Sequence, residues 1–415
     1  MISNEKGFSL TELLVTLVIF VIVIAASSQV FTTLLTNFKQ QGKISETYTE
    51  GLVGLEMLRR DLDHAGFGLP YALNGAPYQE AVAESGQTFW TDRDLNDGPP
   101  DNPARGTDLG SVPGNEHSNP PGAFRSLNNP GIHNSDSGAG FTNQKIANSV
   151  ADVLAIKATA VGMTDTGQKW SYITDSWGTT TMKSWGTGSD AFRNGEFITV
   201  MQPIDGTLKK SLKWNAGTAF YTTFGSTIAV APPANSLTSY IMYGVSDTLP
   251  RMPFNRVDYY VKRPASGMPA RCAPKLGILY KSVLNQSDGK HTEYPILDCV
   301  ADFQVYYVLS DTTGATDCDA GGLPVCGDIS NLTAENIRDR LREVHVYVVA
   351  QEGQKDVKYD YSGGVTTKVA ERTFEVFGAN SRTLNFVDLS LVVGTPEYKY
   401  YHWKLYTLII KPGNL

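Results

Sequence analysis

The chain has 415 residues, of which 41% are hydrophobic and 19% are charged, with a net charge of -7 and a pI near 5.5. This length exceeds that of one small domain, and the apolar content is sufficient for a sizeable core. No basic run stands out, so the sequence lacks the positive footprint of a nucleic-acid-binding protein, and we expect no nucleic-acid partner.

The first predicted element is a long apolar helix that begins near Leu10. No acidic or basic residue occurs in residues 13–38, a stretch of about 26 residues, and about 20 helical residues suffice to cross a bilayer. A short polar leader, residues 1–7, precedes it. Because a secretory signal peptide is cut after its apolar core, this order predicts that the helix stays on the mature protein as a single membrane span. An ordinary N-terminal anchor is the simpler interpretation of the hydropathy alone.

The segment Gly7-Phe8-Ser9-Leu10-Thr11-Glu12 and the apolar run after it closely resemble the class III signal of the type IV pilin family. This resemblance implies that a prepilin peptidase cuts after Gly7, that Phe8 becomes the N-methylated first residue, and that Glu12 serves docking into the filament. The charge itself also indicates a partner, since an ionisable group in a membrane segment is costly. That partner is expected to be the α-amino group of Phe8 or of a neighbouring subunit.

The helix is predicted to continue beyond the membrane part, residues 8–38, as an amphipathic part over residues 39–66. Apolar residues recur there at intervals of three and four and predict one stripe packed against a head: Tyr48, Leu52, Leu55, Leu58 and Leu62. Gly66 and Gly68 mark the predicted end of the helix. Gly42, Gly51 and Gly54 weaken its middle. Because the mid-helix proline of many major pilins is missing, any local melting on assembly is expected at these glycines.

Residues 67–148 are crowded with Gly, Pro, Asn, Asp and Ser, so long regular elements are not expected there. A disordered insertion and an ordered elaboration of the head both fit this composition. Asp92, Asp94 and Asn96 alternate like calcium ligands, but Asp97 and Pro103 replace the glycine and glutamate of an EF-hand loop. Solvated turn carboxylates are the default interpretation, these three residues remain weak calcium candidates, and no cofactor is expected.

Residues 149–415 are predicted to form a β-rich head. Val344, Val346 and Val348 alternate with His345 and Tyr347, which predicts a strand whose one covered face packs on the N-terminal helix. The predicted fold is therefore α+β, a long N-terminal helix against a mainly antiparallel, pilin-like β head. The strand candidates are rich in β-branched and aromatic residues: 151–160, 196–202, 239–243, 257–261, 344–349, 373–377, 384–393 and 398–410.

The four cysteines, Cys272, Cys299, Cys318 and Cys326, lie on the side that pilin topology places outside the cytoplasm, where disulfides are allowed. They permit three connectivities. Strand-like runs at 276–280 and 302–308 flank a polar turn at 285–290, and such a hairpin would bring Cys272 opposite Cys299. Cys318 and Cys326 would then close a small loop. A zinc site is the competing interpretation, but the Cys-x-x-Cys spacing is missing.

Three later segments narrow the resemblance to PilW-type minor pilins: residues 55–68, residues 296–307, and 341–346 together with the tail 403–415. This resemblance implies a subunit that joins other minor pilins and the major pilin, primes assembly at the inner-membrane platform, and ends near the fibre tip. It also implies adhesion or motility as the cellular result, with a large tip adhesin as a further partner. The head would lie in the periplasm and later at the cell surface.

Two alternatives stay open. A minor pseudopilin of type II secretion has the same anchor, although J-type heads are much shorter and the K-type tip subunit typically lacks the acid at the position of Glu12. A membrane-anchored periplasmic enzyme is the alternative of another class. The six histidines form no His-Glu-x-x-His pair and no Gly-x-Ser-x-Gly elbow occurs, so we expect no catalytic residues. Aromatic residues in the membrane helix are interpreted as packing residues rather than as a path for electrons.

Overall fold

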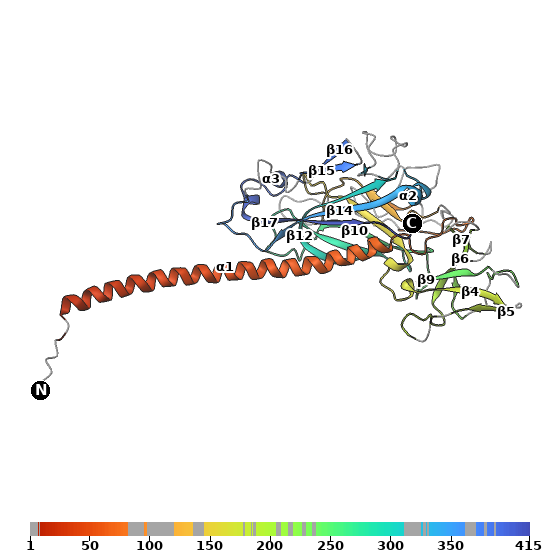
Figure 1. The fold of residues 1–415 in the computed structure, drawn as a ribbon, viewed down its shortest axis with the longest axis horizontal. Coiled ribbons are helices and arrows are strands. Elements are labelled where there is room, and N and C mark those ends of the chain that lie inside the picture. The colour runs from red at the N-terminus through yellow and green to blue at the C-terminus, as the bar shows by residue number, and fades with distance from the viewer. Residues whose placement is uncertain are drawn as a thin grey trace, which may run out of the picture.

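One long helix runs out of a head that is built mainly from two antiparallel sheets (Figure 1). The computed structural model describes residues 7, 9–81, 95–97, 120–135, 145–176, 179–183, 185, 188–204, 209–214, 219–225, 230–234, 238–310, 325–326, 329, 332–361, 371–376, 380–385 and 387–415. The helix α1 (Leu10–His64) has 55 residues, which corresponds to a length of about 82 Å. It ends where Gly66 takes a φ of +83° and donates its N–H to Lys157 O. This confirms the predicted long helix and α+β fold.

The larger sheet has nine strands within the described residues, in the order β1-β3-β10-β11-β12-β14-β17, with β13 beside β12 and β2 beside β10. All pairs are antiparallel except β2 with β10. The strands are β1 (Phe124–Leu127), β2 (His133–Asn134), β3 (Val153–Ala158), β10 (Asn255–Arg263), β11 (Gly277–Leu284), β12 (His291–Leu309), β13 (Val325–Cys326), β14 (Leu341–Glu352) and β17 (His402–Ile410).

A second sheet, in the order β5-β4-β9-β6-β7 with β8 beside β6, lies at the end of the molecule far from the start of α1 (Figure 1). It has its own small core around Ile173, Phe192 and Met242. Its strands are β4 (Trp170–Ser176), β5 (Thr179–Met182), β6 (Phe197–Pro203), β7 (Lys210–Lys213), β8 (Thr222–Thr223) and β9 (Tyr240–Ser246). The remaining elements are the hairpin β15 (Glu371–Val376) and β16 (Asn380–Asn385), the helices α2 (Ala334–Arg340) and α3 (Leu389–Val392), and the 3-10 turns η2 (Thr159–Val161), η3 (Thr166–Gln168) and η4 (Glu397–Tyr400).

The C-terminal half of α1 packs on the larger sheet through a stripe that differs from the predicted one. Tyr48 and Leu52 were expected to be covered but are 39% and 45% exposed. Gly51 and Gly54 face the sheet instead, and a Cβ on Gly54 would lie 1.9 Å from the carbonyl oxygen of Ile296 on β12. Because the helix backbone approaches β12 so closely, the buried stripe follows the glycines: Thr47, Gly51, Gly54, Leu55, Leu58, Asp61 and Leu62.

Strand β14 is covered on both faces, so the prediction of a single covered face is wrong. Val346 and Val348 are fully buried, and so, to within 2%, are His345 and Tyr347. Tyr406, the ladder neighbour of Val348, lies against Gly51 of α1, which places the valine face toward the helix as predicted. On the opposite face, His345 Nε2 lies 2.9 Å from Glu343 Oε2 of the same strand.

Two predicted strands also need correction near the C-terminus. The run 384–393 contains the end of β16 and then α3, because Asp388 accepts a hydrogen bond from Ser390 N and caps a helical turn. The run 398–410 begins with the 3-10 turn η4, and β17 starts only at His402. The hairpin of β11 and β12 around the turn 285–290 is as predicted.

Candidate assembly site on the N-terminal helix

Side chains at the start of α1 cap the helix. Ser9 is the N-cap, with its Oγ accepting from Glu12 N at 3.2 Å, and Glu12 Oε2 accepts from Ser9 N at 3.0 Å. This reciprocal pair is a capping box, which satisfies two N–H groups that a helix start leaves without intrahelical partners. Both residues are exposed, and Gly7 lies two residues before the N-cap. Phe8 lies outside the described residues.

Residues 10–38 carry an apolar surface that no part of the described head covers. Every residue of this segment is exposed, from Leu10 at 81% to Phe38 at 76%. By length and composition α1 can cross a membrane. Threonine hydroxyls in the segment donate to helix carbonyls, as Thr16 does to Leu13 and Thr36 to Thr32. These internal bonds leave the side chains compatible with a medium that offers no water.

The head first contacts α1 at Gln40, whose Nε2 donates to Gln354 O at 3.0 Å. One turn further on, Ile44 lies against Gly353, and Thr47 Oγ1 accepts from Gly353 N at 3.1 Å. The helix is therefore divided into an uncovered apolar half and a half docked on the sheet, with the division near residue 40.

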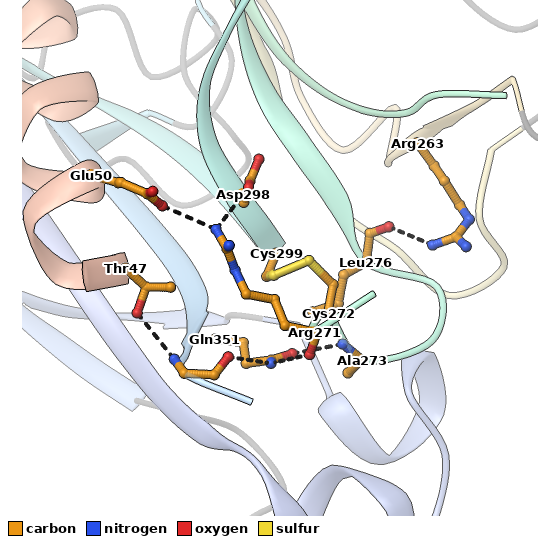
Figure 2. Close-up of a disulfide and its surroundings, with 11 residues drawn as sticks. Thr47, Glu50, Arg263, Arg271, Cys272, Ala273, Leu276, Asp298, Cys299 and Gln351 are labelled. Carbon is orange, nitrogen blue, oxygen red and sulfur yellow. Dashed lines mark hydrogen bonds and ion pairs between the residues drawn. A yellow bond between two sulfur atoms is a disulfide. The ribbon is translucent and has the colours of Figure 1, made fainter. Parts of the chain in front are cut away.

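A disulfide braces the loop that contacts the docked half (Figure 2). Cys272 is bonded to Cys299 of β12, which confirms the predicted pairing across the hairpin. The adjacent Arg271 donates from Nη2 to Glu50 of α1 at 3.0 Å and to Asp298 at 2.8 Å. Figure 2 shows these three side chains converging beside the bridge. The covalent link thus fixes the loop from which Arg271 reaches the helix.

Gln351 of β14 connects the same loop to the sheet. Its Oε1 accepts from Ala273 N at 2.7 Å, and its Nε2 donates to Arg271 O at 2.7 Å and to Gly353 O at 3.1 Å (Figure 2). Because Gly353 also bonds Thr47, one amide links the disulfide loop with the segment that first grips the helix.

A buried acid holds the end of α1 on the sheet. Asp61 Oδ2 lies 2.6 Å from Lys281 Nζ of β11 and accepts from the Tyr259 hydroxyl of β10 at 2.6 Å. Burial raises the pKa of the Asp61 carboxyl, with Lys281 and the Tyr259 hydroxyl opposing that rise. This contact was not predicted from the sequence, because Tyr259 and Lys281 lie about 200 residues from Asp61. Only the motif at residues 55–68 singled out this part of the helix.

The remaining predicted site residues are dispersed. Asp92, Asp94 and Cys318 lie outside the described residues, as does the side chain of Cys326, which is on β13. Asn96 is buried, with Oδ1 accepting from Arg256 and Nδ2 donating to Ala81 O. No group of three or more His, Cys, Asp or Glu that could hold a metal occurs in the described part of the chain.

A buried cluster of charges at the edge of the larger sheet was also not predicted. Lys157 Nζ lies 2.6 Å from Glu80 and 2.7 Å from Asp97, and Arg125 lies 2.6 Å from Asp97. The Arg125 and Lys157 cations outweigh the effect of burial and hold the pKa of Asp97 well below its usual range. This cluster ties residues from the Gly- and Pro-rich region to β1 and β3.

The comparison with family models matches the prokaryotic N-terminal methylation motif to residues 2–28. No curated protein and no solved structure matches the chain. The chain thus carries the class III signal typical of type IV pilins and pseudopilins, on a helix packed against antiparallel sheets. This signal implies processing by a prepilin peptidase, anchoring in the inner membrane before assembly, and association with a pilus or secretion machinery.

Proposed function

We propose that the chain is a minor pilin of the PilW type, which primes type IV pilus assembly together with other minor pilins and stays near the fibre tip. Its partners before export are the prepilin peptidase and the inner-membrane assembly platform. In the fibre they are other minor pilins, the major pilin and, at the tip, a large adhesin.

The observation that carries the proposal is the uncovered half of α1. Residues 13–38 expose a charge-free apolar surface that begins within the matched methylation motif, whereas the head contacts the helix only from Gln40 onward. Such a surface is stable in a lipid bilayer or against the same surface of neighbouring subunits. A pilin needs both environments in turn, first as a membrane protein and then in the helical bundle of a fibre.

Glu12 is the expected contact between subunits in that bundle. In the isolated chain its carboxylate is engaged only with Ser9 among the contacts of the described residues. Since the capping box starts at Ser9, cleavage after Gly7 leaves it intact and places the new α-amino group of Phe8 one residue before the cap. The carboxylate can then exchange its local bond for the amine of a neighbouring subunit, which neutralises both charges away from water.

The head supports a role at the tip rather than along the shaft. About 350 residues follow the helix, and the described ones form two large sheets and one two-stranded hairpin, with the second large sheet at the end farthest from the start of α1 (Figure 1). A subunit with so large a head fits best where few neighbours surround it. The same size argues against a J-type minor pseudopilin.

The test is fibre assembly in cells that lack this gene and carry a plasmid copy. Wild-type protein is expected to restore fibres, and Glu12→Ala to restore few or none although the protein reaches the membrane. Glu56→Ala is the matched control, because Glu56 is a 72% exposed acid on the same helix beyond the membrane part. Normal fibres in the deletion strain, with a defect in protein secretion instead, would contradict the pilus assignment and support the pseudopilin.

A further inference from the structure

A cavity of about 640 Å³ lies beside the start of β4 in the second sheet. This sheet lies at the end of the molecule far from the start of α1 (Figure 1). Two tryptophans line it, Trp170 at the start of β4 and Trp185 in the segment after β5. They are 44% and 45% exposed. Tryptophan has the largest apolar side chain. Two half-exposed tryptophans in one open cavity therefore indicate a binding surface rather than core packing.

The aromatic platform is held in place before any ligand arrives. Trp185 Nε1 donates to Trp170 O at 2.6 Å, and the two rings meet at 64° with centroids 5.5 Å apart. Tyr172, two residues along β4 and therefore on the same face, meets Trp185 with centroids 5.7 Å apart. Rigid aromatic groups lower the entropy that binding would otherwise cost.

The alternation of β4 explains why this platform faces outward. Ser171 and Ile173 are fully buried, and Ile173 belongs to the core of the second sheet. Because side chains alternate along a strand, the residues between and before them, Trp170 and Tyr172, point to the other face. The strand thus covers its own core with one set of residues and presents aromatic rings with the other.

Polar groups complete the lining with a definite charge. The carboxylates of Asp165 and Asp190 and the hydroxyl of Ser189 border the cavity. Among the described lining residues the ammonium is that of Lys169, which is buried and lies 2.5 Å from Glu196, so its charge is already neutralised. Carboxylates accept hydrogen bonds and repel anions, so the cavity suits a ligand rich in hydroxyl or amide donors and without negative charge.

We propose that this cavity binds a neutral carbohydrate, with pyranose C–H faces stacked on Trp170 and Trp185 and sugar hydroxyls donating to Asp165 and Asp190. Sugars combine these two surfaces, one apolar and one rich in donors. A quaternary ammonium would also favour indole faces and a carboxylate. However, the volume is that of a small-molecule site rather than of a single cationic head group, since such sites span about 300–1,000 Å³.

The assay is titration of the purified mature chain in a polyoxyethylene detergent, which has no sugar head group to compete. The neutral probes are lactose, cellobiose and N,N′-diacetylchitobiose, followed by tryptophan fluorescence and calorimetry. The charged probe is 3′-sialyllactose, which adds a carboxylate to lactose. At least one neutral probe is expected to bind, and sialyllactose is expected to bind at least about tenfold more weakly than lactose.

Variants connect the binding to the cavity. Trp170→Ala and Trp185→Ala are each expected to weaken the neutral sugar at least about tenfold, and Trp170→Phe is expected to keep part of the affinity with a native melting curve. Tyr294→Ala is the matched control, because Tyr294 is 37% exposed on β12 of the other sheet. It is expected to leave the affinity unchanged.

Several results would overturn the proposal. These are no binding to any neutral glycan on a broad array, binding that survives both tryptophan variants, tighter binding of sialyllactose than of lactose, or displacement of the sugar by choline. The assay uses purified protein and the fibre count uses cells, so the carbohydrate site and the pilus role can fail independently.

Discussion

The close approach of α1 to the sheet makes Gly54 the most sensitive position on the docked helix. A Cβ there would lie 1.9 Å from the Ile296 carbonyl oxygen and 2.8 Å from its carbon. Both atoms are backbone of β12, so no rotamer change relieves the clash, and the helix must move away from the strand. The overpacking cost belongs at the upper end of about 1–3 kcal/mol. The helix propensity of alanine returns about 1 kcal/mol. Gly54→Ala is therefore expected to weaken docking by about 2 kcal/mol.

Hydrogen exchange of the mature chain in detergent, measured by mass spectrometry, reports how often the docked part of α1 opens from the sheet. A loss of about 2 kcal/mol raises the open population of residues 47–62 by about 30-fold, and their amides are expected to exchange faster by that factor. Peptides from the second sheet should keep their rates, because the clash lies on the other sheet.

Two glycines on the same helix serve as controls. Gly42 has nothing within 4 Å of its would-be Cβ, so Gly42→Ala is expected to slow exchange slightly through propensity alone. Gly51 meets the Leu297 side chain at 3.1 Å, a flexible obstacle, and Gly51→Ala should fall between the two. If Gly54→Ala protected the helix as Gly42→Ala does, the inference that glycine is required for contact would be wrong.

Three further predictions concern the stability of the head, each measured by denaturant titration. The double substitution Cys272→Ser with Cys299→Ser removes a bridge across 27 residues and should cost about 2–4 kcal/mol; a difference below about 1 kcal/mol would contradict a stabilising role. Burial raises the pKa of Asp302 to about 6, so its protonated form stabilises the fold below its unfolded pKa and this contribution is lost as the pH rises through 6. Wild-type protein should therefore lose about 2 kcal/mol relative to Asp302→Asn between pH 4.5 and 7.5, and parallel pH profiles would refute this. Lys157→Met removes the ammonium shared by two buried carboxylates but leaves Glu80 with Arg256 and Asp97 with Arg125, so it should destabilise by about 3 kcal/mol, the lower end of the range for a broken buried pair. A change as small as that of the exposed control Lys183→Met would show that the cluster is not stabilising.

Local features of the chain were predictable from the sequence. The apolar run indicated where α1 begins, and the glycines after His64 indicated where it ends. The Ser9-to-Glu12 capping box at the helix start was not predicted. The pairing of Cys272 with Cys299 was predictable because a hairpin with a short polar turn fixes the positions of both residues.

Features that depend on distant segments were not predictable. The stripe on α1 was predicted from large apolar residues, but the sheet approaches the helix along Gly51 and Gly54, where small size matters more than hydrophobicity. Strands β4, β5 and β7 of the second sheet were not predicted; β5 and β7 consist largely of threonine, serine and lysine, whereas β4 is rich in aromatic and β-branched residues and was missed. The contact of Asp61 with Lys281 joins residues 220 positions apart, so no local sequence pattern predicts it.

Intact mass of the protein extracted from membranes tests the central claim most directly. We predict a single species that begins at Phe8 and carries one added methyl group. When the prepilin peptidase is deleted, we expect neither the loss of residues 1–7 nor the added methyl group. A chain that retains Met1, or one cleaved beyond Ala26, would contradict the claim that this helix is processed and assembled as a pilin.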